Sequence, residues 1–406
     1  MKITKIKDES FSELVNFKKN QNEIIHRWFN IKEGYSKELI FTLIKNLQIK
    51  DGFIVDFFNG SGTTSLAAKE KGFKYYGFEV NPFLFLLSKV KTTDYSETDI
   101  KEIHNEKVKI LKNYKNVKKY EDIKLSIMEN VFRENLVDIM KVRTLILNIK
   151  NKKIKDFFII ALTTILEDVG YSKKDGNGLK YPKNKNIVSF VEKFSKQIDL
   201  MISDIKSFKN KNIKTSNIEL LDSRNIPKKY LDTLKGKTSM VVYSPPYANC
   251  FDYSEVYKLE LWLSGYIDEY KKLQKLRNDS LSSHLNKELN YYEEYPLIKN
   301  DLKQIKNTWS KKIPMMLNGY FYDMEKIIAN SFHILKKGGY CVIIVGNSAY
   351  SGHIIKTDEI LSSIGEKIGF SEIKIHIARK LRASSQQAKL FKNNTSLRES
   401  VIIMKK

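Results

Sequence analysis

The sequence predicts an α/β fold in which an open, mostly parallel sheet of seven strands carries an inserted helical region. Two observations support this prediction. Short apolar runs recur between longer stretches of helical periodicity, and the last two runs follow each other without a helical stretch. The expected strands are residues 53–58, 74–79, 217–221, 239–243, 340–345, 371–378 and 399–404. Ligands bind such a sheet at the carboxyl ends of its strands, so the loops at that edge are the candidates for function.

The first expected strand, 53–58, leads into residues 59–64 and then a helical stretch that reaches Lys71. Gly60 and Gly62 would let the backbone approach a ligand closely, and the start of the helix supplies unpaired N–H donors. A capped turn between strand and helix is the ordinary alternative. The third glycine of a dinucleotide-binding loop is missing, because Thr64 and Ser65 stand in its place, and this argues against NAD.

The second expected strand, 74–79, ends in Glu79. A carboxylate at this position can bind both hydroxyls of a ribose. About 135 residues then separate this strand from the third, far more than one crossover helix needs. We expect a mostly helical insertion there. Its basic loop, 172–183, combines lysines with Tyr181 and suits a phosphate backbone and an exposed base, although a solvated linker explains it equally well.

The fourth expected strand, 239–243, is followed by Ser244, Pro245, Pro246 and Tyr247. Two prolines cannot continue a sheet ladder, so the chain must leave the sheet here. The loop offers a hydroxyl, a rigid carbonyl and an aromatic ring, which suit a flat ligand with an exocyclic amine. A structural turn is the ordinary alternative for such a composition.

Composition limits the classes of function. The 406-residue chain has 71 Lys plus Arg against 47 Asp plus Glu, a net charge of +24, which favours a polyanionic partner unless an AT-rich genome alone explains the lysines. Two cysteines, Cys250 and Cys341, indicate a reducing compartment, and six scattered histidines give no metal site. Without an apolar signal core or a membrane span, a soluble cytoplasmic protein is expected.

Together the loops resemble the amino methyltransferases of DNA, which use S-adenosylmethionine to methylate cytosine N4 or adenine N6. Residues 56–64 are similar to that family's first cofactor motif, 79–82 to its second and 244–247 to its catalytic loop. Residues 34–36, before a periodic helix, resemble the amino-terminal motif that closes over the methionine end of the cofactor. The resemblance runs from about residue 27 to the last strand and implies a seven-stranded Rossmann-like methyltransferase sheet.

The resemblance also implies roles for individual residues. The cofactor-binding residues would be Ser36, Asp56, Phe58, Gly60, Gly62, Thr63, Thr64, Glu79, Asn81 and Asp222, and the catalytic residues Ser244, Pro245, Pro246 and Tyr247. Ser244 and the Pro245 carbonyl would draw the amino hydrogens away from the methyl acceptor, while Tyr247 stacks on a base flipped out of the duplex. No metal is needed. Asp222 would contact the adenine edge of the cofactor, with a helix cap as the alternative.

The same resemblance gives five segments with different roles. They are 1–98, the start of the core with the cofactor motifs; 99–213, the helical insertion, a candidate for target recognition; 214–267, the core with the catalytic loop; 268–318, a second insertion and a candidate for DNA contact; and 319–406, the end of the core. The residues alone do not decide which of the two insertions reads the target sequence. In the second insertion, residues 277–284 mix donors suited to phosphates and base edges.

A serine at position 244 resembles the cytosine N4 group, since the adenine N6 group usually carries Asp or Asn there. We therefore expect a site-specific cytosine N4 methyltransferase of double-stranded DNA in a restriction–modification or related defence system, with a cognate restriction endonuclease as partner. Adenine N6 methylation, RNA methylation and a DNA-binding subunit without catalysis remain alternatives. Cytosine C5 methylation is disfavoured, because Tyr247 and not a cysteine follows Pro246, and Cys250 fits a packing role.

Overall fold

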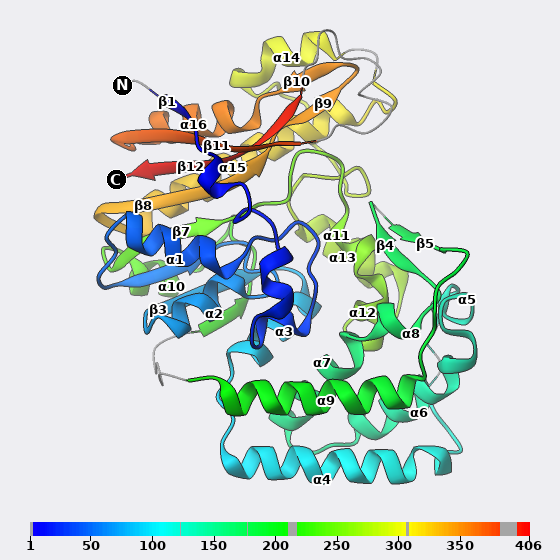
Figure 1. The fold of residues 1–406 in the computed structure, drawn as a ribbon. Helices are drawn as coiled ribbons and strands as arrows, with labels where there is room; N and C mark the ends of the chain where they lie inside the picture. Colours follow the sequence, from blue (N-terminus) through cyan, green and yellow to red (C-terminus); the bar gives the residue numbers. More distant parts are fainter. Residues whose placement is uncertain (1–2, 122, 177, 210–216, 306–307, 382–395) are drawn as a thin grey trace.

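The structure is a computed structural model with a sheet core and a helical assembly beside it (Figure 1). It describes residues 3–121, 123–176, 178–209, 217–305, 308–381 and 396–406. Asn177 of the basic loop and residues 210–213 at the end of the predicted helical insertion lie outside the described residues. Within the described part, no helix combines the length and the apolar character that crossing a bilayer requires.

The sheet has eight strands in the order β1-β11-β12-β8-β7-β2-β3-β6, and β12 alone runs against the others. The strands are β1 (Thr4–Lys7), β2 (Phe53–Asp56), β3 (Lys74–Glu79), β6 (Asn217–Leu220), β7 (Thr238–Tyr243), β8 (Leu335–Gly346), β11 (Glu372–Leu381) and β12 (Leu397–Lys405). All seven expected strands are present. The predicted count of seven is nevertheless wrong, because β1 adds a parallel edge strand beside β11. With one apolar residue in four, β1 has no pattern that separates it from a loop.

Helices cover both faces of the sheet, and the period-two alternation of the strands decides which side chain meets which helix. Ile54, Met240 and Val242 belong to a hydrophobic cluster with residues of α1 and α2, whereas Val55 and Val241 belong to one with α10, α15 and α16. The helices are α1 (Lys37–Asn46), α2 (Thr63–Glu70), α10 (Lys228–Leu234), α15 (Ile313–Ile334) and α16 (Thr357–Ile368). The core therefore has three layers.

The expected helical insertion lies between β3 and β6, below the sheet in Figure 1. It holds α4 (Glu97–Asn113), α5 (Met128–Phe132), α6 (Leu136–Leu147), α7 (Lys152–Thr163), α8 (Leu166–Val169), α9 (Phe190–Ser207) and a hairpin of β4 (Lys173–Asp175) and β5 (Gly178–Lys180). Along α9, Phe190, Phe194, Ile198 and Met201 recur every three or four residues and are fully buried. Together with α3 (Pro82–Thr92), which follows β3, these helices form a second hydrophobic core.

The segment after β7 joins this second core. Its helices are α11 (Tyr253–Val256), α12 (Lys258–Leu263) and α13 (Tyr270–Asp279), and Trp262 and Leu273 are buried among residues of the insertion. Farther along the chain come α14 (Lys299–Gln304) and a hairpin of β9 (Ser348–Tyr350) and β10 (His353–Ile355). Short 3₁₀ helices lie at Glu9–Phe11, Lys18–Asn22, His26–Trp28, Tyr114–Asn116, Arg133–Asn135 and Pro296–Ile298. The boundaries of the five predicted segments stay a prediction.

Candidate active site

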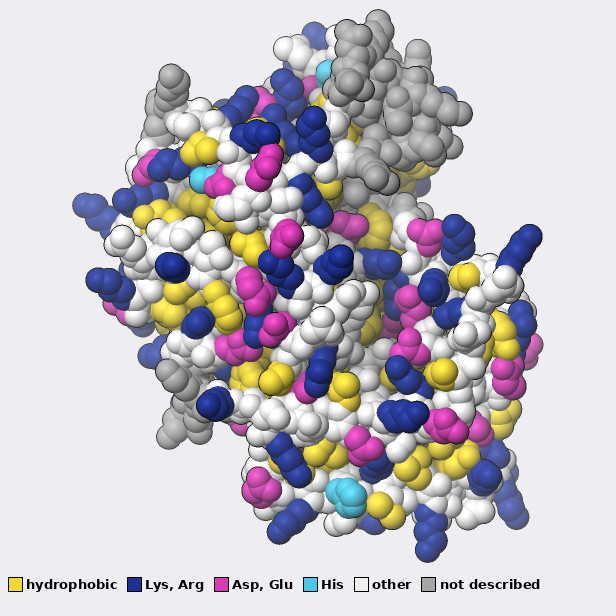
Figure 2. All heavy atoms as spheres, in the orientation of Figure 1, with side chains coloured by type: hydrophobic (Ala, Val, Ile, Leu, Met, Phe, Trp, Pro, Cys, Tyr) yellow, Lys and Arg dark blue, Asp and Glu magenta, His cyan; other side chains and the backbone are white. Residues whose placement is uncertain are grey.

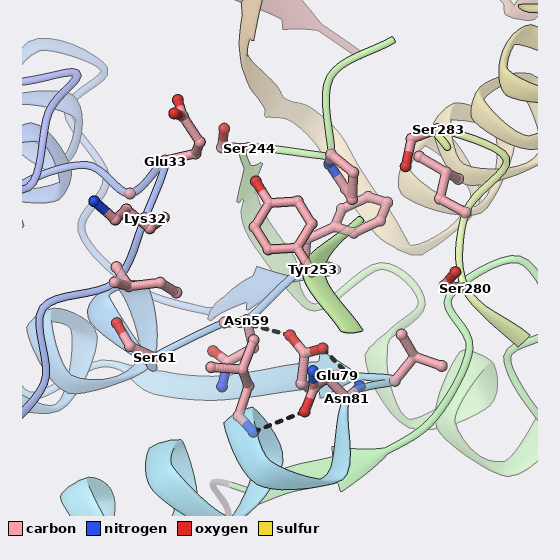
Figure 3. A pocket seen from close by; sticks show the side chains of 18 of the residues that line it. Lys32, Glu33, Asn59, Ser61, Glu79, Asn81, Ser244, Tyr253, Ser280 and Ser283 are labelled. Carbon is pink, nitrogen blue, oxygen red and sulfur yellow. Dashed lines mark hydrogen bonds between the residues drawn. The ribbon is translucent and has the colours of Figure 1, made fainter. Parts of the chain in front are cut away.

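An open cavity of about 920 Å³ lies at the carboxyl ends of β2, β3 and β7. It is closed on one side by residues 31–35, before α1, and on the other by the end of α13 and the residues after it (Figure 3). Of the residues predicted from the sequence, those that line it are Phe58, Gly60, Thr63, Glu79, Asn81, Ser244 and Pro246. The fold thus brings the two expected cofactor loops and the expected catalytic loop to one cavity.

Glu79 joins two of these loops. Its Oε2 accepts a hydrogen bond from the Gly60 N–H at 2.7 Å and its Oε1 one from the Asn81 N–H at 2.8 Å (Figure 3). Burial raises the pKa of this carboxyl to about 7, although the backbone hydrogen bonds act in the opposite direction. Each carboxylate oxygen has a further lone pair, so Glu79 can still accept hydrogen bonds from two hydroxyls of a ligand.

Asp56 stands behind the cavity wall. Its carboxylate accepts hydrogen bonds from the Tyr35 hydroxyl and the Phe58 N–H, both at 2.9 Å, and the Tyr35 hydroxyl also contacts Thr64. Burial raises the pKa of Asp56 to about 6. Asp56 and Thr64 therefore tie the loop before α1 to the start of α2. They position the cavity wall, and neither lines the cavity itself.

Two more predicted residues also lie outside the cavity. The Ser36 hydroxyl is fully buried and donates to the Leu14 carbonyl at 3.2 Å. Gly62 has a φ of +80°, and a Cβ there would come within 2.8 Å of the Ser88 Cβ on α3. A glycine is therefore needed at position 62 for close packing of the loop on α3.

In the expected catalytic loop, Ser244 and Pro246 face the cavity, whereas Tyr247 does not line it. The Tyr247 hydroxyl donates to Glu399 Oε1 at 2.6 Å, and a Cβ at Gly346 would meet the tyrosine ring at 2.8 Å. The ring expected to stack on a base is thus packed against the paired residues Gly346 of β8 and Glu399 of β12.

Another aromatic ring, Tyr253, does line the cavity, which the sequence analysis missed. Figure 3 shows it between Ser244 and Glu79. Its ring meets that of Phe251 edge to face at 4.7 Å, and burial raises its pKa well above the usual value. Two aromatic residues so soon after the catalytic loop were the available signal in the sequence.

Asp222 borders an adjoining, smaller cavity of about 300 Å³, which shares Phe58, Glu79 and Val80 with the first. Both of its carboxylate oxygens accept hydrogen bonds from Arg224 Nε at 3.0 Å, and the Arg224 N–H donates to it at 2.9 Å. Arg224 also pairs with Asp323 on α15, at 3.0 Å. The acceptor expected to read the cofactor's adenine edge is therefore already engaged by a neighbouring arginine.

Residues 277–284, expected to offer donors to DNA, turn inward. Arg277 Nε lies 3.0 Å from Asp252 Oδ2 and 3.1 Å from the Ser254 hydroxyl, and His284 is only 3% exposed. Four members of this segment line the cavity: Ser280, Leu281, Ser283 and His284. The sequence showed their polarity, but it gave no sign that the donors would be used within the fold.

The outer surface is strongly basic, as the net charge requires. Figure 2 shows lysines and arginines projecting around the rim of one face, with acidic side chains interspersed nearer its middle. Among the residues with assigned positions, no group of three or more His, Cys, Asp or Glu could hold a metal ion.

Comparison with known proteins adds to this geometry. Residues 7–90 match the N6_N4_Mtase family, described as DNA methylase. Three type II methyltransferases are similar over nearly the whole chain. M.BsoBI of Geobacillus stearothermophilus is 28% identical, covering 98% of this chain and 89% of its own. M.AvaI of Anabaena variabilis is 28% identical, covering 98% of this chain and 90% of its own. M.MvaI of Kocuria varians is 23% identical, covering 95% of this chain and 92% of its own.

Proposed function

Because the chain is a relative of the N6/N4 amino DNA methylases, we propose that it moves a methyl group from S-adenosylmethionine to an exocyclic amine of double-stranded DNA, and that this amine is N4 of cytosine. The observation that supports this most is the shared cavity. Ser244 of the expected catalytic loop and Glu79 of the expected ribose site line the same space.

The residues of the cavity fit S-adenosylmethionine. Glu79 offers a buried carboxylate to the ribose hydroxyls, Phe58 and Val80 offer apolar surface to a purine, and Gly60 lets the backbone come close to the ligand. The cofactor, when bound, supplies a methyl group on a sulfonium, which is electrophilic without help from a metal.

The remaining chemistry falls to the loop after β7. An exocyclic amine is a poor nucleophile, because its lone pair is delocalised into the base. In our proposal the Ser244 hydroxyl and the Pro245 carbonyl accept its hydrogens, which favours the geometry that exposes the lone pair. In this proposal Tyr247 holds the catalytic loop in position through its hydrogen bond to Glu399. The aromatic ring inside the cavity is that of Tyr253.

The choice of cytosine rests on Ser244, as in the group that the catalytic loop resembles. The similar proteins are type II methyltransferases, so we place this chain in a restriction–modification system in the cytoplasm, with DNA as substrate and a cognate restriction endonuclease as partner. The net charge of +24 suits a polyanionic substrate.

Replacing Ser244 with Ala tests the catalytic loop. We expect the rate of methyl transfer to fall about 100- to 1,000-fold, since an oriented hydrogen-bond partner of the reacting amine is lost. Affinity for S-adenosylhomocysteine, measured by calorimetry, should stay unchanged. Ser371→Ala is the matched control. That serine is exposed, and its hydroxyl and its N–H both donate to the Lys405 carbonyl. Full activity of Ser244→Ala would exclude the proposed role of this hydroxyl.

A further inference from the structure

The catalytic loop contacts a carboxylate on β12, the strand that runs against its neighbours. The reversed direction brings the start of β12 to the edge of the sheet where β7 and β8 end. Glu399 lies there, opposite Gly346 of β8 on one side and Arg379 of β11 on the other. Residues that stand opposite each other in a sheet point to the same face, so the three share one face of the sheet.

Glu399 is buried between fixed partners. The residue is 2% exposed. Its Oε2 accepts a hydrogen bond from Arg379 Nε within an ion pair, and its Oε1 accepts one from the Tyr247 hydroxyl at 2.6 Å. Gly346 leaves room for the tyrosine ring, which a Cβ there would meet at 2.8 Å. The ion pair with Arg379 therefore holds a carboxylate oxygen in place as an acceptor for Tyr247.

These contacts decide where the proton of Tyr247 points. Burial raises the pKa of the Tyr247 hydroxyl well above its usual value, as does Glu399, so the hydroxyl keeps its single proton. The carboxylate can only accept, so that proton points to Glu399. The Ser244 hydroxyl also hydrogen-bonds with Tyr247 and acts to lower that pKa. Since the Tyr247 proton is already used, Ser244 must be the donor in this second hydrogen bond.

The direction of that hydrogen bond matters for the reacting amine. The Ser244 hydroxyl lines the cavity and has one proton and two lone pairs (Figure 3). A hydroxyl that rotates freely could turn its proton toward a ligand and compete with the hydrogens of an amine. With the proton turned to Tyr247, only lone pairs of Ser244 are left for the cavity. A serine held in this way accepts hydrogen bonds from a ligand and does not donate them.

We propose that Glu399 is a positioning residue for methyl transfer, which acts through Tyr247 to fix the Ser244 hydroxyl as a hydrogen-bond acceptor for the exocyclic amine of the target base. The inference rests on the proposed function and deepens it. It explains how a serine, which can both donate and accept, is restricted to the role that the amine requires.

Two variants interrupt this chain of hydrogen bonds at different points. Tyr247→Phe removes the hydroxyl that receives the Ser244 proton. In Glu399→Gln the amide oxygen must face Arg379, so the amide N–H donates to Tyr247 and the Ser244 proton is turned into the cavity. The kcat for methyl transfer to DNA should fall about tenfold in Tyr247→Phe, the usual effect of losing one oriented hydrogen bond, and at least as much in Glu399→Gln.

The controls separate this effect from damage to the fold. Affinity for S-adenosylhomocysteine, measured by calorimetry, should stay unchanged in both variants. Glu372→Gln is the matched control, because Glu372 is an exposed carboxylate at the other end of β11, paired with Lys374. It should transfer methyl groups at the rate of the wild type.

A double-mutant cycle distinguishes positioning from structural support, with the methyl group labelled so that slow rates are measurable. If Glu399 acts through Ser244, then Glu399→Gln should change the rate less than about twofold in a Ser244→Ala background. Losses that multiply in the double variant, or a wild-type rate in Glu399→Gln or Tyr247→Phe, would overturn the inference while methyl transfer by the wild type stands. A wild type that transfers no methyl group to DNA would overturn the proposed function and the inference with it.

Discussion

At the scale of single residues, Glu79 connects the fold to the ligand. Its two oxygens hold the Gly60 and Asn81 N–H groups, so the carboxylate fixes the relative positions of two loops. The Glu79 carboxyl is buried, and this burial raises its pKa from the usual 4.5 to about 7. The residue proposed to bind the ribose thus titrates close to neutral pH.

This titration predicts a pH dependence. Between pH 4.5 and 7 the folded protein holds a proton that the unfolded chain releases, so the contribution of Glu79 to stability falls as pH rises across that window. Ligand hydroxyls bind the charged carboxylate better, so affinity should change in the opposite sense. Calorimetry should show S-adenosylhomocysteine bound about tenfold more weakly at pH 6 than at pH 8.

His284 also lines the cavity and titrates, so a His284→Asn variant serves as control for that measurement. It should keep the pH dependence if Glu79 causes it. An affinity that is flat between pH 6 and pH 8, or stronger at pH 6, would remove Glu79 from the ribose site.

The residues also show what the sequence could and could not reveal. The two cofactor loops and Ser244 could be placed together, because the carboxyl ends of parallel strands meet at one edge of a sheet. The partners of Tyr247 and Asp222 could not be foreseen. Tyr247 is held by Glu399, 152 residues away, and nothing in the sequence distinguishes a free Asp222 from one paired with Arg224. Pairings between side chains depend on the finished fold.

At the scale of elements, the β4–β5 hairpin is the clearest candidate for DNA contact. Lys174 anchors it: its Nζ lies 2.5 Å from Glu260 Oε1 on α12 and sits over the rings of Phe29 and Tyr257. Strand alternation then turns Lys173 to the exposed face, directly opposite Lys180. The hairpin contacts α11, which carries Tyr253 of the cavity wall.

We expect the two exposed lysines of the hairpin to bind phosphates. Lys180 Nζ lies 3.3 Å from Asp175 Oδ2, an exposed ion pair that a DNA phosphate can replace at small cost. A phosphate would also relieve the repulsion between the two opposed lysines. The double variant Lys173→Ala, Lys180→Ala should weaken DNA binding and lower the slope of log affinity against log salt by about two. Fluorescence anisotropy over a salt series measures both.

The matched control is Lys101→Ala, Lys112→Ala on α4, at the far edge of the helical assembly in Figure 1. An unchanged salt slope for the hairpin variant, or an equal loss for the α4 variant, would count against the hairpin. The sequence predicted a basic loop here but not its hairpin form, since a strand of three residues carries too little periodicity.

At the scale of the whole molecule, the cavity lies between two hydrophobic cores. Leu84 and Leu276 belong to the core of the helical assembly and Leu281 to one core of the sheet, and all three line the cavity. The chain after the catalytic loop is buried in the helical assembly through Trp262. The sequence predicted both the sheet and the helical insertion. It could not predict that α11–α13 pack on the insertion, because this packing depends on contacts between distant segments.

The central claim is methyl transfer to an amine of DNA, and identification of the product tests it most directly. The wild-type protein is incubated with S-adenosylmethionine carrying a labelled methyl group and double-stranded DNA of mixed sequence, in parallel with RNA. The products are digested to nucleosides and separated by mass spectrometry. The account predicts label in N4-methyl-2′-deoxycytidine. Label in N6-methyl-2′-deoxyadenosine alone would contradict the choice of cytosine, and label in neither, although the protein binds the cofactor, would contradict the claim itself.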